Sequence, residues 1–302
     1  MTVRSLAIFA DIHANLPALE AVLDDISRQN VDEVLVGGDL VGRGPEGSAV
    51  AKRIRELGFA TIGGNHEDYL LDFRGRRVPD EWWTSREWAA ARWMAEELDD
   101  DDEAYLASLP FSLEREDLIL IHGTPDSNRD GIGPWTSDEQ IKDFHTAGGR
   151  PILVCAHTHR PMLQETGDGL VVNVGSVGLP FNRDQRAQYA ILRRGGRWGW
   201  EVEMRQVPYD VDRVRKIYQE TGFREAGGAT AELLLLELEH ASPLLVPFIK
   251  WAEVTGVEAT TEQLEDFFNF MPPGGRLRDF AMSIRALEAK DKVAGPPNAA
   301  SD

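Results

Sequence analysis

Five short apolar runs in this chain each lead into a histidine, an aspartate or an asparagine. In chain order they are LAIFADIH, VLVGGD, ATIGGNH, LILIHG and ILVCAHTH. Each run has the length and aliphatic content expected of a buried β-strand. In open α/β sheets, the loops beyond the carboxyl ends of the strands present the side chains of a site. The runs therefore predict an α/β fold in which strand ends gather metal-binding side chains.

Helical patterns separate the first three runs, whereas strand patterns dominate afterwards. Pro17 stands where the first turn of a helix tolerates proline, and apolar residues then recur at helical spacing up to Ile26. This βαβαβ order indicates parallel strands joined by crossover helices. Five strand patterns follow between residues 117 and 207, and the last two resemble a hairpin. A mixed sheet, or two packed sheets, fits this order better than a purely doubly wound fold.

The chain divides into a core, a helical extension and a tail. We assign the core to residues 1–208, the helical extension to 209–291 and a disordered tail to 292–302. The helical extension carries none of the motif histidines. Its apolar segment 233–238 is expected to pack on the chain's own core, with a contact in a homo-oligomer as the alternative.

A tryptophan-rich segment follows the third run. Residues 80–98 are predicted to form one helix, with Thr84 and Glu87 in capping-box relation, ended by an acidic stretch at 96–103. Helix core is the default role of its tryptophans, and a lid over an aromatic leaving group is the alternative. The four tryptophans of this segment are Trp82, Trp83, Trp88 and Trp93. The same two roles apply to Trp135, which lies in a later loop.

Composition limits the partners of the protein. Acidic residues outnumber basic ones by 51 to 32, and the net charge of −19 argues against a broad nucleic-acid-binding face. A small phosphorylated ligand stays compatible, because bound metal ions can dominate the local field. The only cysteine, Cys155, lies in an apolar run and is expected to be a buried hydrophobe. No signal-peptide pattern or membrane-length apolar stretch is found, so we expect a cytoplasmic protein without membrane contact.

The residue types at the strand ends indicate metal chemistry. Asp11 and His13 are spaced by two, as are His157 and His159, so each pair is expected to project to one side of an extended segment. Carboxylate, imidazole and amide ligands without thiolate suit Mn, Fe, Zn, Co or Ni. Ligands from five loops can hold two ions, and two ions form a clamp for in-line displacement at phosphorus.

The order of the motifs resembles the calcineurin-like metallophosphoesterase superfamily. D-x-H, G-D, G-N-H, H-G and H-T-H occur in that order over about residues 1–200. The stretches GDLVGRGP, HGTPDS, AHTHRP and NVGSVGLPFN resemble a bacterial and archaeal subgroup of small phosphodiesterase-like proteins. The resemblance implies a four-layer αββα sandwich of two mixed sheets.

The resemblance also implies roles for individual residues. One divalent ion would be held by Asp11, His13, Asp39 and His159. A second would be held by Asp39, Asn65, His122 and His157, which makes Asp39 the bridge. His66 matches the histidine that contacts the phosphate or protonates the leaving group.

Two positions depart from the pattern of the superfamily. Ala156 stands where glycine usually precedes H-T-H, and we expect the site to tolerate one methyl group. Arg43 stands where the subgroup more often has an aromatic residue. It is either a clamp on a phosphate oxygen or a surface arginine in a glycine-flanked loop. Asn65 has an alternative role as a turn residue, although its place before His66 favours the ligand role.

These inferences predict a dinuclear-metal phosphohydrolase that favours phosphodiesters. Hydroxide held at Asp39 would attack phosphorus, with His66 assisting the leaving group and Arg43 available to stabilise charge. A phosphomonoesterase, or a phosphatase acting on nucleotides or proteins, is the nearest alternative. A non-catalytic scaffold of the same fold is a further alternative, but such a scaffold is expected to lose ligands.

Overall fold

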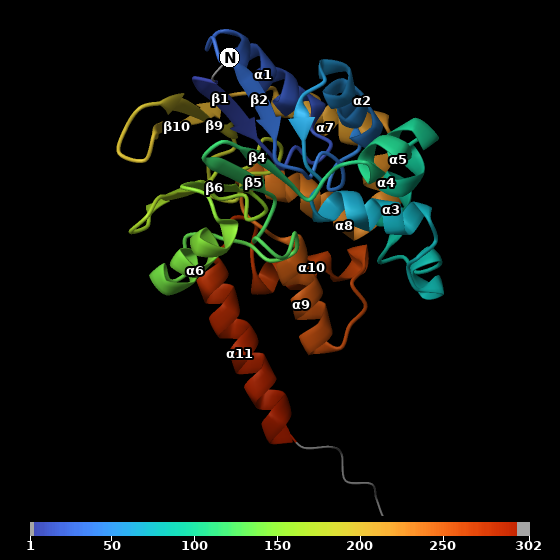
Figure 1. Ribbon diagram of the computed structural model, residues 1–302. Helices are drawn as coiled ribbons and strands as arrows, with labels where there is room; N and C mark the ends of the chain where they lie inside the picture. The colour runs from blue at the N-terminus through green and yellow to red at the C-terminus, as the bar shows by residue number, and fades with distance from the viewer. Residues whose placement is uncertain (1–2, 295–302) are drawn as a thin grey trace, which may run out of the picture.

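Two five-stranded sheets form the centre of the protein in the computed structural model, which describes residues 3–294 (Figure 1). In the first sheet the spatial order is β10–β9–β1–β2–β3. Its first three strands in the chain run parallel. β9 is antiparallel to β1, and β10 is antiparallel to β9, with which it forms a hairpin. The bounds of these strands are β1 (Ser5–Phe9), β2 (Glu33–Val36), β3 (Ala60–Thr61), β9 (Ala187–Arg194) and β10 (Trp200–Val207).

The second sheet has the order β4–β5–β6–β8–β7. Its three central strands are parallel, whereas both edge strands are antiparallel to their neighbours. Both sheets are therefore mixed, as the strand order in the sequence predicted. The bounds are β4 (Ser112–Arg115), β5 (Leu118–Ile121), β6 (Ile152–Cys155), β7 (Met162–Glu165) and β8 (Leu170–Asn173).

Alternation along the strands creates three apolar layers. In β1, Phe9 packs toward helices α1 (Leu16–Ser27) and α2 (Gly47–Leu57), while Ile8 packs toward the second sheet. On the far side, α6 (Asp138–Gly148) covers the second sheet (Figure 1). The four-layer αββα sandwich is thereby confirmed. Cys155 lies buried in the layer beneath α6, as expected of a small hydrophobe.

The region after the third strand differs from the prediction. Instead of one helix over 80–98, there are η1 (Asp80–Trp83) and α4 (Ala89–Glu97), after an unpredicted α3 (Asn65–Arg74). The predicted capping box does not form, because Thr84 Oγ1 donates to the carbonyl of Glu81. The acidic stretch does end α4 at Glu97, as predicted, and it also begins a further helix that was not predicted, α5 (Asp100–Ala107). Acidic side chains are favourable there because the start of a helix carries partial positive charge.

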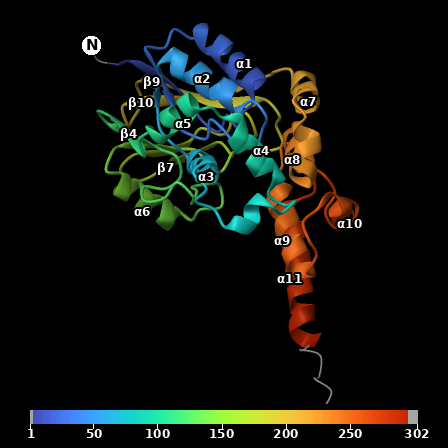
Figure 2. The ribbon, with the colours of Figure 1, turned by 90° about the vertical axis from the view of Figure 1, so that its right-hand side faces the viewer.

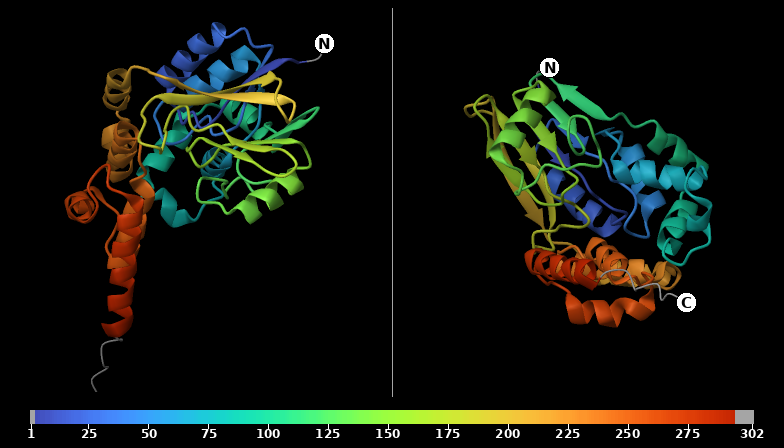
Figure 3. Two further views of the ribbon diagram at one scale, coloured as in Figure 1. Left: turned by 90° about the vertical axis from the view of Figure 1, so that its left-hand side faces the viewer. Right: turned by 90° about the horizontal axis from the view of Figure 1, so that it is seen from below.

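The helical extension stands along one side of the sandwich (Figures 2 and 3). Leu234 and Leu238 pack in the layer beside the first sheet, and Leu233 packs among the C-terminal helices. The leucines of 233–238 thus serve the chain's own core, and an oligomer contact elsewhere on the helical extension stays a prediction. The elements are α7 (Val211–Glu220), α8 (Phe223–His240), α9 (Leu245–Thr255), η2 (Thr261–Gln263), α10 (Leu264–Phe270) and α11 (Leu277–Ala294).

The end of α11 corrects the predicted start of the tail. Residues 292–294 continue this helix, which projects away from the sandwich (Figure 1). The remainder of the predicted tail, 295–302, lies outside the described residues. Within residues 3–294, none of the helices combines the length and the apolar character that a bilayer span requires.

A buried carboxylate ties α1 to the hairpin of β9 and β10. Tyr189 Oη donates to Asp25 Oδ2 at 2.7 Å, and the guanidinium of Arg205 donates to both oxygens of the same carboxylate at 2.9 and 3.2 Å. Burial opposes the charge, but the hydrogen bonds from Arg205 and Tyr189 outweigh it and lower the pKa of Asp25 below its ordinary value of 3.8.

We expect the substitution Asp25→Asn to destabilise the protein in a pH-dependent way. Because the pKa is lower in the folded state, the charged group stabilises the fold above the unfolded pKa of 3.8 and loses that effect as pH falls through the folded pKa. Because the Arg205 side chain is 25% exposed, solvent screening limits the deficit to about 1 kcal/mol near neutral pH. Urea unfolding from pH 7 to pH 3 measures it, and a deficit that grows on acidification would contradict this account.

Candidate metal centre

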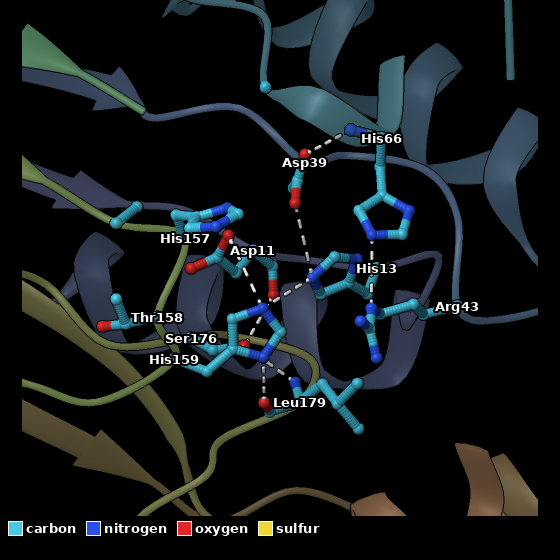
Figure 4. Close-up of polar contacts among 12 residues, drawn as sticks. Asp11, His13, Asp39, Arg43, His66, His157, Thr158, His159, Ser176 and Leu179 are labelled. Atoms are coloured by element: carbon cyan, nitrogen blue, oxygen red, sulfur yellow. Dashed lines mark hydrogen bonds and ion pairs between the residues drawn. The ribbon is translucent and has the colours of Figure 1, made fainter. Parts of the chain in front are cut away.

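The predicted ligands lie together where the carboxyl ends of the parallel strands of both sheets face each other. Asp11 and Asp39 follow β1 and β2 of the first sheet, while His122 and His157 follow β5 and β6 of the second. Figure 4 shows the side chains from both sheets pointing toward one another. Asp11, Asp39 and His122 are buried with at most 1% of their surface exposed, so the site lies inside the sandwich and not on its surface.

The backbone of these loops is left-handed and not extended. Asp11, His13, Asp39, His157 and His159 all have φ between 51° and 65°. The D-x-H and H-x-H pairs therefore do not lie on extended segments, and the reason given above for their pointing to one side is wrong. Instead, backbone hydrogen bonds hold the strained turns, since the N–H groups of Asp11 and His13 donate to the carbonyls of Gly38 and Asp39. Such strain is typical of functional sites.

Two groups of possible ligand atoms share Asp39. The first ligand group is Asp11, His13, Asp39 and His159, and the second contains Asp39, His122 and His157; within each group the atoms lie within 4.8 Å of one another. Asn65 joins the second ligand group, because its Oδ1 lies 3.2 Å from His122 Nε2 and 2.8 Å from His157 Nδ1. These groups match the two sets that the resemblance implied, and the role of each residue as a ligand stays a prediction.

The donor atoms fit divalent cations. Both carboxylate oxygens of Asp11 are buried without a hydrogen-bond partner, which is costly unless a cation meets them. His122 Nδ1 donates to the carbonyl of Gly37 at 2.8 Å, and His159 Nδ1 donates to that of Leu179 at 2.6 Å. Each bond directs the other ring nitrogen, Nε2, into the site, as is usual for histidines that bind metals.

The electrostatics of the centre favour positive charge near Asp39. Burial opposes ionisation of Asp39, but His122 and His66 hold the pKa of its carboxyl well below its usual range. Burial likewise opposes a charge on His122, yet the carboxylate of Asp39 raises its pKa to about 10. In contrast, burial lowers the pKa of His157 to about 4 and keeps its ring neutral, the form that binds metals.

Glu67 is a buried residue of the site that sequence reasoning missed. Its carboxylate accepts from the N–H groups of Gly64 at 2.6 Å, Asp39 at 2.9 Å and Leu40 at 2.7 Å, and so joins the loop after β2 to the start of α3. Burial raises the pKa of Glu67 to about 7. The signal was available, since glutamate three residues after Gly64 has capping-box spacing.

His66 stands beside both ligand groups on the first turn of α3. Its backbone N–H donates to Asp39 Oδ1 at 2.8 Å, and its ring lies 4.9 Å from that of His13. Burial lowers the pKa of His66 to about 4, so the ring is neutral and Nε2 accepts from Arg43 Nε at 3.2 Å. Gly42 is required next to this ring, because an added Cβ would come within 2.4 Å of Nδ1.

Arg43 is largely buried, so the alternative role of a surface arginine in a glycine-flanked loop is wrong. Its side chain is 17% exposed, and Nη1 donates to Oε2 of Glu237 at 3.1 Å (Figure 4 shows the arginine below His66). Glu237 belongs to α8 and is fully buried. The same carboxylate accepts the N–H groups of Leu244 and Leu245 at the start of α9. The helical extension therefore holds Arg43 in place, while the phosphate-clamp role stays a prediction.

Other positions have structural roles. Ala156 is buried between the two sheets, so its methyl group adds to the core. Asn15 caps α1 by accepting the N–H of Ala18, and Ser176 Oγ donates to the carbonyl of Asp11. His145, which fits no motif, lies 3.1 Å from the carbonyl of Pro151 through Nε2.

The two mixed sheets gather carboxylate, imidazole and amide groups at their strand ends, which are the donor types of a divalent-metal centre. The sequence profile of the calcineurin-like phosphoesterase superfamily domain matches residues 5–195. The chain belongs to this superfamily, as the motif order predicted.

Relatives support the bacterial and archaeal subgroup. MJ0912 of Methanocaldococcus jannaschii is 26% identical over 238 residues, 72% of this chain and 92% of that protein. The phosphodiesterase YfcE of Escherichia coli is 25% identical over 202 residues, 62% of this chain and 86% of that protein. The crystal structure of a metallophosphoesterase from Sphaerobacter thermophilus is 26% identical with a TM-score of 0.66, covering 80% of this chain and 100% of that chain.

We expect Asp39→Asn to lower metal binding in both ligand groups at once, because one carboxylate serves both. Elemental analysis after equilibration with Mn²⁺ should show a loss of more than one ion equivalent, whereas Asp11→Asn should affect mainly one. Asp143→Asn, on the exposed side of α6, is the matched control and should bind as the wild type does. Equal stoichiometry for Asp39→Asn and the control would rule out a shared ligand.

We expect Glu237→Gln to lower the free energy of unfolding by about 2 kcal/mol, since hydrogen bonds to charged groups are worth ~1.5–3 kcal/mol. The amide oxygen can still accept both N–H groups of α9, which share Oε1 of Glu237, but the NH₂ group that replaces Oε2 cannot accept from Arg43. Glu253→Gln, with a side chain 70% exposed, is the control and should leave stability unchanged. Urea denaturation measures both variants, and equal midpoints would contradict a structural link through Glu237.

Proposed function

We propose that this protein hydrolyses phosphodiesters with two divalent ions held by the first and second ligand groups. The observation that carries the proposal is the shared carboxylate of Asp39, which belongs to both groups in a chain of the phosphoesterase superfamily. The donor types favour Mn, Fe, Zn, Co or Ni. The substrate is a small phosphorylated molecule, and a cytoplasmic location stays a prediction.

The residues around the proposed ions have separate roles in the reaction. When bound, the ions supply an activated water and neutralise the oxygens of the phosphoryl group. Asp39 keeps the two ligand groups together and, through the N–H of His66, fixes the start of α3 beside them. His66 stands beside both ligand groups, where its proposed role is to contact the phosphate or to assist protonation of the departing oxygen once substrate is bound. Arg43, held by Glu237, presents a guanidinium for a phosphate oxygen.

Two considerations favour the diesterase over its alternatives. The Escherichia coli relative carries the name phosphodiesterase. A non-catalytic scaffold has no need of buried ligands, whereas this chain retains all seven together with His66. The phosphomonoesterase and the nucleotide or protein phosphatase differ from the diesterase in substrate alone, so turnover distinguishes them.

The test is an assay of the purified protein with Mn²⁺ on generic phosphodiesters, phosphomonoesters and nucleotides. We expect diesters to have the highest kcat/KM. His66→Ala should lower kcat by about 100-fold or more while leaving the bound metal unchanged, because general acid catalysis contributes ~10²–10⁴-fold. His240→Ala, a histidine of the helical extension outside the ligand groups, should leave kcat and metal content unaltered.

The outcomes separate the parts of the proposal. Normal metal binding without turnover of any phosphate ester would support the scaffold and overturn the enzyme. Faster turnover of monoesters than of diesters would support the phosphomonoesterase. Unchanged turnover in His66→Ala would remove this residue from the mechanism and leave the metal centre in place.

A further inference from the structure

A cavity of about 250 Å³ opens directly beside the metal centre. Arg43, Asn65 and His66 form its inner end, so it is continuous with the second ligand group. One wall comes from α3 and α4 of the core, and the opposite wall comes from α8 and α9 of the helical extension. The cavity is close to the lower limit of about 300 Å³ for small-molecule sites, which suits one ring system better than a peptide.

The core wall of the cavity is aromatic and rigid. Trp88 lines the cavity and stacks on Trp82, with ring centroids 3.8 Å apart and planes 12° apart. Tyr69, also in the wall, has its ring 6.0 Å from Trp88 and 6.1 Å from His66. Of the four tryptophans near the G-N-H motif, Trp88 is the one that lines this cavity, so the default role of core packing applies to the others.

The opposite wall is apolar and partly open. Leu234 and Phe248 are buried there, whereas Val246 and Ile249 on α9 are 59% and 42% exposed at the rim. Large apolar side chains that stay exposed beside a site are typical of ligand binding. The charged members of the lining besides Arg43 are Glu87 and Arg129, which carry opposite signs.

We propose that this cavity binds an uncharged aromatic ring on the ester group that leaves the phosphodiester, an inference that rests on the proposed function. The position beside His66 is where a departing group lies when this histidine assists its protonation. In the reaction, water supplies OH to phosphorus, the P–O bond to the aromatic ester breaks, and the departing oxygen takes up the remaining proton. The flat faces of Trp88 and Tyr69 favour an aromatic ring over an alkyl group.

Binding of two stable phosphonates tests the proposal without turnover. Isothermal titration calorimetry of the Mn²⁺-loaded protein compares phenylphosphonate with methylphosphonate, which share one anionic group. We expect phenylphosphonate to bind about ten-fold more tightly or better, because apolar groups in a fitted pocket change affinity ~10–200-fold. 4-Carboxyphenylphosphonate should lose this advantage, because its charge enters an apolar wall.

Variants at the rim locate the effect in the cavity. Val246→Asp and Ile249→Asp should bring the phenyl-to-methyl affinity ratio close to one and lower kcat/KM for phenyl diesters about ten-fold, with a smaller loss for dialkyl diesters. Both side chains are exposed, so folding should persist, and thermal unfolding checks it. Val257→Asp, 37% exposed and outside the cavity lining, is the matched control and should retain the ratio of the wild type.

Each contrary result has one meaning. Equal affinity of the wild type for both phosphonates, or an unchanged ratio in both rim variants, would overturn the proposal. A dimer of the wild type that Val246→Asp dissociates in sedimentation velocity would also overturn it, because the rim would then be an interface between copies. A high phenyl-to-methyl ratio without hydrolysis of any diester would sustain the cavity and overturn the proposed function.

Discussion

The shared carboxylate of Asp39 is the interaction on which the rest of the site depends. It lies within reach of both ligand groups, accepts the backbone N–H of His66 and raises the pKa of His122. Its position depends in turn on Glu67, which accepts the backbone N–H of Asp39 from below. A single buried acidic residue thus joins the ends of two sheets, and its charge is tolerable only because histidines and N–H groups surround it.

The layers of the fold could be predicted from the sequence, but the segments between them could not. Parallel and antiparallel strands have different sequence patterns and connections, so the mixed sheets followed from strand order. The prediction of one helix over residues 80–98 was wrong. Tryptophans at helical spacing do not reveal that the helix is interrupted after Trp83, an arrangement in which Trp82 stacks on Trp88. Tertiary packing overrides local propensity at such points.

The side chains of the site were predictable because each follows an apolar run, and the resemblance divided them into two groups that the structure also brings together. The reason given for the D-x-H and H-x-H spacings was wrong, since these turns are left-handed. The contact between Glu237 and Arg43 could not be predicted, because no sequence pattern connects α8 with a residue 194 positions earlier. Contacts of this kind depend on the fold as a whole and not on any local pattern.

Five of the proposed metal ligands adopt a backbone conformation that non-glycine residues avoid. At roughly 1 kcal/mol each or more, these conformations together cost an amount comparable with the net stability of a whole domain. Burial in the two sheets offsets that cost. The positions of the proposed ligands therefore depend on the packing of the whole sandwich and not on its loops alone.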